Sequence, residues 1–285
     1  MKFDSIGVVG FGTMGSGVVV TAVSKGLDVK VFTRSEDSYK KGLAQVEGSL
    51  ARFIKKGLLP DGASDYIKRC SRVTEFKEFT NCDFVLEAVP ESKKLKREIF
   101  KKLDAELSSE ITIASNTSSV SITEISDATS HPGRVIGMHF MNPVPLMPLV
   151  EIIQGKNTNA ETLAKAKKLA EILGKTAVEV KDSPGFAINR LLIPQINEAC
   201  FAVMEGISDA NGIDTVMKLG ASHPMGPLAL GDLIGLDIVL AIMESLHQGF
   251  GDDKYRPCPL LAQMVRDGKL GRKTGQGFFD YAKRA

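Results

Sequence analysis

The chain has 285 residues, 43% of them hydrophobic, with 36 basic and 34 acidic side chains. This length allows a sizeable core and two domains, and the near balance of charge gives no reason to expect a nucleic-acid partner. The longest apolar runs are too short to cross a membrane, and the N-terminus has no signal-peptide pattern. The four cysteines are scattered without a Cys-x-x-Cys motif. We therefore expect a cytoplasmic protein with reduced thiols and no metal site.

Strands and helices are predicted to alternate over about the first 180 residues. The expected strands cover residues 6–10, 28–33, 82–89, 111–115, 135–140, 149–153 and 177–180. The expected helices cover residues 13–25, 36–56, 63–69, 93–107 and 160–173. The first strand–helix–strand unit should be a right-handed crossover between parallel strands. This order predicts the α/β class, with a Rossmann-type doubly wound sheet.

The pattern changes near residue 183, beyond which apolar periodicity marks helices only. These helices are expected at residues 187–205, 213–219, 227–246 and 259–267. We therefore expect a first domain of residues 1–183 and a smaller all-α domain of residues 184–285. The helix at 227–246 has more apolar residues than one buried stripe needs, and a small domain often buries such an excess against a second copy. The sequence thus predicts a homodimer formed through the C-terminal domain.

The segment Gly-Phe-Gly-Thr-Met-Gly at residues 10–15 fits the pattern G-x-G-x-x-G. The bare pattern is weak, but here it directly follows the first strand and opens the first helix. At that place Gly10 permits a tight turn, Gly12 lets the backbone approach a pyrophosphate, and Gly15 permits close packing of helix on strand. The anion would bind the N-terminal turn of the helix, which contains Thr13 and Met14. The sequence therefore predicts a dinucleotide site.

The end of the second strand bears on which nucleotide binds. An acidic residue there would grip the ribose 2′-hydroxyl of NAD(H), but this strand ends at Thr33 and Arg34. Arg34 could bind the 2′-phosphate of NADP(H) by charge-assisted hydrogen bonds. Alternatively, Arg34 stacks on the adenine and NAD(H) binds without the acid. The sequence is compatible with either cofactor and leans slightly toward NADP(H).

A histidine and a glutamate lie in the consecutive strands 135–140 and 149–153. His139 is near the end of the first, Glu151 is within the second, and three prolines between them keep the connection out of the sheet. If the strands are neighbours, the carboxylate can orient the imidazole, as in a general base that works near neutral pH. The alternative is a buried core histidine with an unrelated glutamate. This stretch by itself leaves both interpretations open.

Seven ordered motifs together resemble the short-chain 3-hydroxyacyl-CoA dehydrogenases, in particular the bacterial 3-hydroxybutyryl-CoA dehydrogenases of butyrate metabolism. The motifs lie at residues 10–15, 87–91, 115–119, 137–143, 182–190, 224–227 and 271–279. The resemblance covers essentially the whole chain. It implies reversible oxidation of a (S)-3-hydroxyacyl-CoA to a 3-ketoacyl-CoA with a nicotinamide cofactor, in fatty-acid β-oxidation or butyrate synthesis.

The resemblance also implies roles for individual residues. His139 matches the family's catalytic general base and acid, and Glu151 matches its carboxylate partner. Ser118 and Asn189 match polar residues that bind the substrate and polarise its oxygens. The cofactor contacts that the resemblance and the glycine pattern imply are Gly10, Gly12, Thr13, Met14, Gly15, Thr33, Arg34, Ala88, Val89, Glu91, Lys96, Asn116, Ser118, Asn142 and Lys273.

Coenzyme A carries phosphates and needs cations. In the family a helical pair, here about residues 36–70, projects and helps to bind it. Arg52, Lys55 and Lys56 lie on this pair and are our candidates, although a solvated basic helix face is an equally good explanation for any one of them. Two other functions remain open: a dehydrogenase of a free hydroxy acid, and a nucleotide-binding relative without activity. Retention of Ser118, His139, Glu151 and Asn189 argues against the second.

Overall fold

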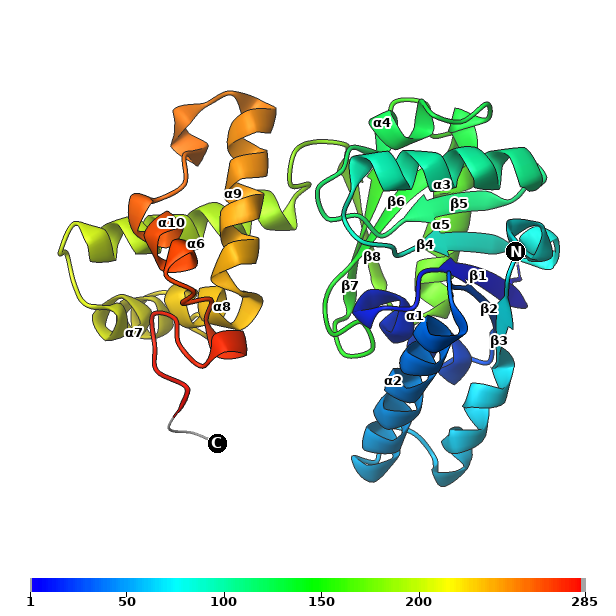
Figure 1. Cartoon of the computed structure of the whole chain (residues 1–285), viewed down its shortest axis with the longest axis horizontal. Helices are drawn as coiled ribbons and strands as arrows, with labels where there is room; N and C mark the ends of the chain where they lie inside the picture. Colours follow the sequence, from blue (N-terminus) through cyan, green and yellow to red (C-terminus); the bar gives the residue numbers. More distant parts are fainter. Residues whose placement is uncertain (1, 283–285) are drawn as a thin grey trace. The chain divides into compact units, whose positions relative to one another are not determined.

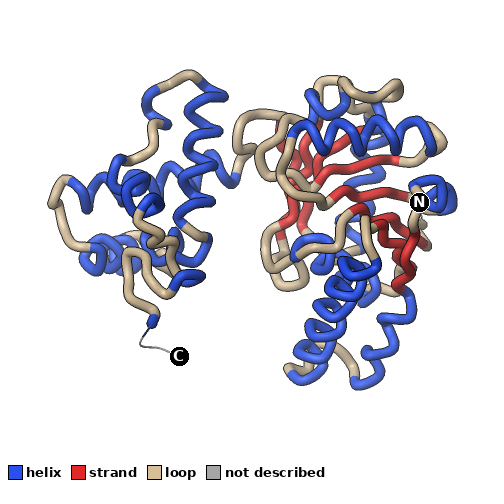
Figure 2. Tube along the Cα trace, viewed as in Figure 1, coloured by secondary structure: helices blue, strands red, loops and turns tan. Residues whose placement is uncertain are grey.

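The computed structural model describes residues 2–282. The chain divides into two compact units, Met1–Ser183 and Pro184–Ala285, called here the first and second units. The strands lie in the first unit, whereas the second is built from helices and loops (Figure 2). The fold expected from the sequence, a Rossmann-like sheet followed by a helical region, is confirmed. No helix of the described residues is long and apolar enough to cross a membrane.

The first unit contains one mixed sheet of eight strands in the order β3-β2-β1-β4-β5-β6-β7-β8. The strands are β1 Ser5–Val9, β2 Asp28–Phe32, β3 Cys70–Val73, β4 Phe84–Glu87, β5 Thr112–Ser115, β6 Val135–Phe140, β7 Leu149–Gln154 and β8 Thr176–Lys181. All neighbours are parallel except β6 and β7, which are antiparallel. The order of strands reverses between β1 and β4, and in such sheets ligands bind at this switch point, beyond the carboxyl ends of the strands.

Helices cover both faces of this sheet. They are α1 Thr13–Ser24, α2 Glu36–Lys55, η1 Asp61–Arg69, η2 Phe76–Asn81, α3 Lys93–Glu106, α4 Ile122–Ser126, η3 Pro132–Arg134 and α5 Ala160–Ile172. One buried cluster joins α1, α2 and α5 to the sheet. Figure 1 shows α2 and η1 side by side, projecting beyond the β3 edge. The expected helical pair is therefore present, although its second member is a 3-10 helix.

Alternation along the strands decides which side chains meet each layer. On β1, Ile6 and Val8 belong to the cluster with α1, so Gly7 faces the other side. There the ring of Phe79 packs so closely that a Cβ on Gly7 would lie 2.7 Å from it. On β6, Met138 and Phe140 belong to the α1 cluster, and His139 therefore points to the opposite face.

The second unit has its own hydrophobic core. Its helices are α6 Ile188–Met204, α7 Ala210–Gly220, α8 Pro227–Ile234, α9 Leu236–Phe250, η4 Asp253–Tyr255, α10 Pro259–Arg266 and η5 Arg272–Thr274. Two buried aspartates tie these elements together. Asp214 accepts hydrogen bonds from the N–H groups of Leu228 and Ala229 and so caps α8. Asp232 accepts from the N–H groups of Phe278 and Phe279 and from the hydroxyl of Tyr281.

One expected helix was wrong, and one strand and one α-helix were missed. The single helix at 227–246 is two helices, because Gly235 between α8 and α9 has φ +105°, which a helix cannot contain. The short strand β3 and the helix α4 were not expected. β3 is only four residues long with a polar sequence, and it forms because it pairs with β2 along the edge of the sheet. Ser121 starts α4 by accepting a hydrogen bond from the N–H of Glu124.

Candidate active site

The antiparallel pairing of β6 and β7 brings His139 directly opposite Glu151. Directly opposed residues point to the same face of a sheet, so their side chains can meet. The His139 Nδ1 atom lies 2.7 Å from Glu151 Oε2. Both residues are buried, at 7% and 2% exposed. A hydrogen bond of this length between an imidazole and a carboxylate fixes the orientation of the ring, as the sequence led us to expect if the two strands were neighbours.

Asn116 joins the end of β5 to the end of β6. Its Oδ1 atom accepts a hydrogen bond of 2.9 Å from the backbone N–H of Phe140, the residue after His139. The turn that carries Ser118 follows directly. Thus Ser118, Asn116 and His139 come from two neighbouring strand ends at one edge of the sheet. In this structure the side-chain oxygen of Asn116 is therefore bonded to the protein backbone. The resemblance implied that Asn116 contacts the cofactor.

Glu91 holds the turn that carries Ser118. Its Oε1 atom accepts from the N–H groups of Ser118 and Ser119, each at 3.0 Å, from the Ser119 hydroxyl at 3.0 Å and from the Thr117 hydroxyl. Burial by itself would raise the pKa of Glu91, but the Lys96 ammonium and these donors together hold the pKa below its ordinary value. The carboxylate therefore stays ionised at neutral pH and can accept all of these hydrogen bonds from the turn.

Lys96 is buried beneath this turn, with its side chain 1% exposed. Its Nζ lies 2.8 and 3.0 Å from the two carboxylate oxygens of Glu87 and 3.3 Å from Glu91 Oε2. Two of the residues implied as cofactor contacts, Glu91 and Lys96, are thus joined in one network. Glu87, its third charged member, was not among the site residues expected from the sequence.

The glycine loop has the geometry that its pattern predicted. Gly10 has φ +100°, and a Cβ there would lie 2.7 Å from the carbonyl oxygen of Ala88. A Cβ on Gly15 would lie 2.1 Å from the carbonyl oxygen of Gly10, which leaves no room for a side chain. By contrast, a Cβ on Gly12 would meet nothing within 4 Å. Gly12 is also the N-cap of α1, and no side chain in the described part of the chain caps that end of the helix.

A cavity of about 560 Å³ lies over this loop. It is lined by residues 9–14, 32–34 and 88–90, by Ser38, Lys41 and Gln45 of α2, and by Leu95 and Ile99 of α3. These segments follow β1, β2 and β4, around the switch point of the sheet. Open space at Gly12, an uncapped helix N-terminus and apolar walls fit a dinucleotide with its pyrophosphate over α1. The residues present therefore fit the cofactor that the glycine pattern predicted.

The end of the cavity next to the tip of β2 carries the basic side chains Arg34 and Lys41. Thr33 is buried, and its hydroxyl donates to the carbonyl of Ser35, whereas Arg34 is exposed at the rim. The nearby Glu36 is 2.5 Å from Arg72, so its carboxylate is paired with another side chain. Sequence reasoning missed Ser38, Lys41 and Gln45. Their spacing of three and four residues places them on one face of α2, and that spacing could have identified them.

The remaining first-unit candidates lie on the surface. Asn142 is exposed in the loop after β6. Arg52, Lys55 and Lys56 are exposed at the end of α2, where Arg52 donates to the Ser49 hydroxyl. Their position on the projecting helical pair agrees with the expectation, but a solvated basic helix end has the same appearance.

Two candidates belong to the second unit. Asn189 lies in the first turn of α6. Lys273 lies in η5, and its Nζ forms an ion pair of 2.6 Å with Asp237 Oδ2 at the start of α9. The segment that carries Lys273 packs against Asp232, since a Cβ on Gly271 would lie 2.3 Å from the Asp232 carbonyl oxygen.

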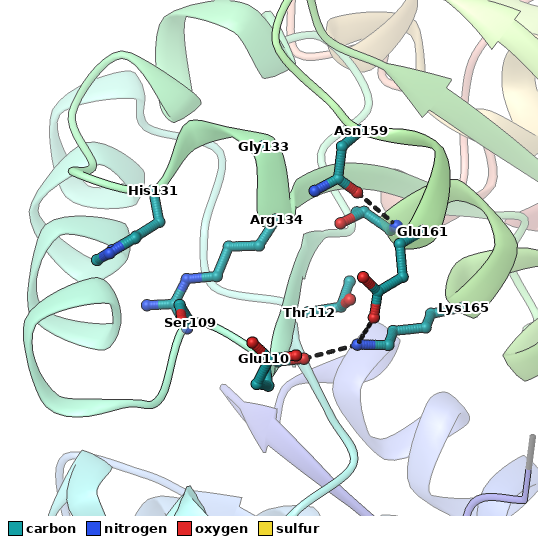
Figure 3. Close-up of a pocket in the computed structure, with 10 residues that line it drawn as sticks. Ser109, Glu110, Thr112, His131, Gly133, Arg134, Asn159, Glu161 and Lys165 are labelled. Carbon is teal, nitrogen blue, oxygen red and sulfur yellow. Dashed lines mark hydrogen bonds and ion pairs between the residues drawn. The ribbon is translucent and has the colours of Figure 1, made fainter.

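A second cavity, of about 310 Å³, lies among residues at the start of β5, in η3 and at the start of α5 (Figure 3). Its polar groups are engaged within the fold. Lys165 contacts Glu161 and the Glu110 carbonyl, as Figure 3 shows. Arg134 donates to Asp104 and to carbonyl groups at the end of α3. Lys165 and Arg134 are already bonded to carboxylate and carbonyl groups of the protein. This cavity is therefore a poor candidate for a ligand site. No group of three possible metal ligands occurs among the residues that the structure describes.

Comparisons with known proteins agree with this arrangement. Residues 5–183 match the 3-hydroxyacyl-CoA dehydrogenase NAD binding domain, and residues 185–281 match the C-terminal domain of the same family. The chain is 49% identical to a probable 3-hydroxybutyryl-CoA dehydrogenase of Bacillus subtilis, over 100% of this chain and 99% of that protein. It is 48% identical to a probable 3-hydroxybutyryl-CoA dehydrogenase of Deinococcus radiodurans, over 99% and 100% of the two chains.

Solved structures extend this agreement to the fold. The crystal structure of (S)-3-hydroxybutyryl-CoA dehydrogenase from Ralstonia eutropha superposes with a TM-score of 0.95 and 45% identity, covering 99% of this chain and all of the other. The family resemblance found in the sequence is thereby confirmed, as is the presence of an NAD binding domain. This chain belongs to the 3-hydroxyacyl-CoA dehydrogenase family.

Proposed function

We propose that this protein interconverts (S)-3-hydroxybutyryl-CoA and acetoacetyl-CoA, with a nicotinamide cofactor as the partner in hydride transfer. The single observation that carries this proposal is the buried His139–Glu151 pair in a unit that matches an NAD binding domain. The relatives of nearly equal length that are named 3-hydroxybutyryl-CoA dehydrogenases support the choice of substrate. Fatty-acid β-oxidation and butyrate synthesis are the two pathways in which this reaction would serve.

The bound nicotinamide would supply a hydride acceptor in one direction and a hydride donor in the other. His139 takes the proton of the 3-hydroxyl group during oxidation and returns it to the 3-keto oxygen during reduction. Because Glu151 engages Nδ1, we assign this proton to Nε2. The Glu151 carboxylate holds the ring in the tautomer that carries hydrogen on Nδ1, and it stabilises the imidazolium after proton uptake. These two residues thus act as one unit.

Ser118 and Asn189 are proposed to bind the substrate's 3-oxygen and thioester carbonyl. A hydroxyl and an amide can donate hydrogen bonds to both oxygens without adding charge. Arg52, Lys55 and Lys56 are proposed to bind the phosphates of coenzyme A. The glycine loop, together with Ala88, Val89 and the basic rim at Arg34 and Lys41, is proposed to bind the dinucleotide.

NADP(H) preference remains a prediction, made in the sequence from Thr33 and Arg34. The matched family domain is an NAD binding domain and gives no support to that preference. What favours it physically is a cavity rim with two cations, Arg34 and Lys41, and no acidic residue among the described residues of the lining.

A homodimer through the second unit is proposed from its exposed apolar side chains. On the helix first considered, Leu233 and Ile238 are 49% and 46% exposed, whereas Leu236, Val239 and Met243 are buried. The most exposed large apolar side chains of the unit belong instead to α6, α7 and the segment between them: Leu191, Ile207, Val216 and Leu219, at 64% to 81% exposed. Contact with a second copy would remove this surface from water.

Oxidation of NADH and of NADPH with acetoacetyl-CoA tests the proposed reaction, with free acetoacetate as the control substrate. We expect loss of the reduced-nicotinamide absorbance with the thioester. Loss with free acetoacetate at an equal rate would favour the free-acid alternative. No oxidation with either cofactor and either substrate would overturn the proposed function.

A further inference from the structure

We infer that Glu87 is a positioning residue, whose buried carboxylate fixes Lys96 and, through Lys96 and Glu91, the turn that carries Ser118. This inference rests on the proposed function, in which Ser118 binds the substrate. Glu87 is the last residue of β4 and is 0% exposed. A carboxylate in such a place is costly unless charged and polar partners surround it.

Those partners come from three separate segments. The Lys96 ammonium of α3 contacts both oxygens of Glu87, at 2.8 and 3.0 Å. The N–H of Val89, in the loop after β4, donates to Oε1 at 2.6 Å. The hydroxyl of Ser115 donates to Oε2 at 2.6 Å, and Ser115 is the residue paired with Glu87 at the end of β5. One carboxylate thus joins β4, α3 and β5.

The network continues from these partners to the Ser118 turn by two routes. Ser115 Oγ also accepts from the backbone N–H of Thr117 at 3.2 Å. Lys96 lies 3.3 Å from Glu91, whose other oxygen holds the N–H groups of Ser118 and Ser119. Residues on either side of Val89 also line the dinucleotide cavity. Glu87 is therefore shared by the Ser118 turn and one wall of the cofactor cavity.

The charges explain why Glu87 matters to Glu91. Lys96 is a single ammonium between two carboxylates, and it is closer to Glu87 than to Glu91. If Glu87 loses its charge, the nearest remaining anion for the buried ammonium is Glu91. Glu91 would then be drawn away from the N–H groups of the turn. Ser118 would lose its fixed position although the hydrophobic core of the unit is unchanged.

Kinetics of Glu87→Gln test this inference, because glutamine keeps the size of the side chain and removes its charge. We expect kcat for acetoacetyl-CoA reduction to fall at least about tenfold. The dissociation constant for NADH should stay within about threefold of wild type, because the glutamine amide oxygen can still accept from the Val89 N–H and so keep that wall of the cavity in place. Circular dichroism confirms folding at the assay temperature. Glu124→Gln is the matched control, since Glu124 pairs with Lys93 of the same helix in an exposed ion pair. It should leave kcat unchanged.

A double-mutant cycle with Lys96→Met separates positioning from a general loss of stability. If Glu87 acts through Lys96, the double variant retains kcat within about threefold of Lys96→Met alone. Losses in kcat that multiply would overturn the inference, as would normal kcat in a folded Glu87→Gln. If Glu87→Gln does not fold, Glu87→Asp decides: it keeps the charge but withdraws the carboxylate from Lys96, and unchanged kcat contradicts the inference. An inactive wild type would instead overturn the proposed function, and with it this role of Glu87.

Discussion

His139 and Glu151 are opposed across the one antiparallel strand pair of the described sheet, and this register sets Nδ1 2.7 Å from the carboxylate. A shift of one residue would turn one of the two side chains to the opposite face. The strand register therefore brings the two side chains into contact, and their hydrogen bond does not depend on a loop movement.

Substitution of this pair should affect turnover and spare nucleotide binding. We expect His139→Ala and Glu151→Gln to lower kcat by about 10²- to 10⁴-fold, the range typical of lost general acid–base catalysis. The dissociation constant for NADH, measured by nucleotide fluorescence, should stay within about threefold, because neither residue lines the dinucleotide cavity. His131→Ala is the control, since His131 also contacts a carboxylate, that of Asp104. Turnover near the wild-type value in His139→Ala would exclude it as the base.

Two glycine-to-alanine substitutions in the glycine loop should have different effects, one on nucleotide binding and the other on stability. Gly12→Ala places a methyl group in open space over α1, so the protein should fold normally and the KM for the dinucleotide should rise by about tenfold or more. Gly15→Ala forces a methyl group against the Gly10 carbonyl and should destabilise the fold by about 1–3 kcal/mol. Thermal unfolding and NADH titration distinguish the two. Equal effects of both variants on stability would contradict this assignment.

The basic rim predicts how nucleotide preference changes. Arg34→Gln and Lys41→Gln should each lower kcat/KM with NADPH by about tenfold, the effect of one lost charge-assisted hydrogen bond. Values with NADH should change by less than about threefold. Lys40→Gln is the matched control, since this exposed neighbour of Lys41 is not part of the cavity lining. A strong NADH preference in the wild type, unchanged in Arg34→Gln, would show that Arg34 does not select the nucleotide.

Most of the sheet and the glycine loop could be predicted from the sequence, because both depend on local patterns. Buried strands are short apolar runs, and the glycine loop has a fixed place after the first of them. The network around Glu87 could not be predicted in this way. Lys96 lies in a strongly basic helix, and such a composition indicates a solvated surface. Its spacing to Phe100 and Leu103, both fully buried on the same helix, is the pattern that could have placed it inside.

Local sequence patterns also failed to predict two features of the second unit. The run at 227–246 has helical periodicity throughout, and only the positive φ of Gly235 divides it. A Cβ on Gly235 would lie 3.1 Å from the Nζ of Lys273, a residue far along the chain, and the local sequence does not display such a neighbour. The exposed apolar residues of α7 were missed for a related reason. Periodicity identifies an apolar stripe, but it does not tell whether the stripe faces the core or the solvent.

Asp104 should make stability depend on pH in the acid range. Burial by itself would raise its pKa, but hydrogen bonds from Arg134 and from the N–H of Ser130 hold the pKa below the ordinary value of 3.8. A carboxyl group whose pKa is lowered by folding stabilises the protein above its unfolded pKa, and this contribution is lost as the pH falls through the folded value.

Asp104→Asn should therefore lower the free energy of unfolding at neutral pH by about 3–5 kcal/mol, because the Arg134 guanidinium is left buried without its anion. The difference between wild type and variant should stay constant down to about pH 4 and shrink below it. Urea unfolding of both proteins at several pH values measures this. A difference that does not depend on pH down to the acid limit of folding would contradict the assigned cause.

Charge on the exposed face of α7 should dissociate the proposed dimer. Val216 and Leu219 are three residues apart on one face of this helix and are 64% and 81% exposed. The wild type should have about twice the chain mass of 30.7 kDa by size exclusion with light scattering, and Val216→Glu/Leu219→Glu should have the mass of one chain, because buried carboxylates oppose association. Leu58→Glu, at an exposed apolar residue of the first unit, is the control and should remain a dimer. A wild type that is monomeric at micromolar concentration would refute the dimer, and a dimeric double variant would move the interface away from α7.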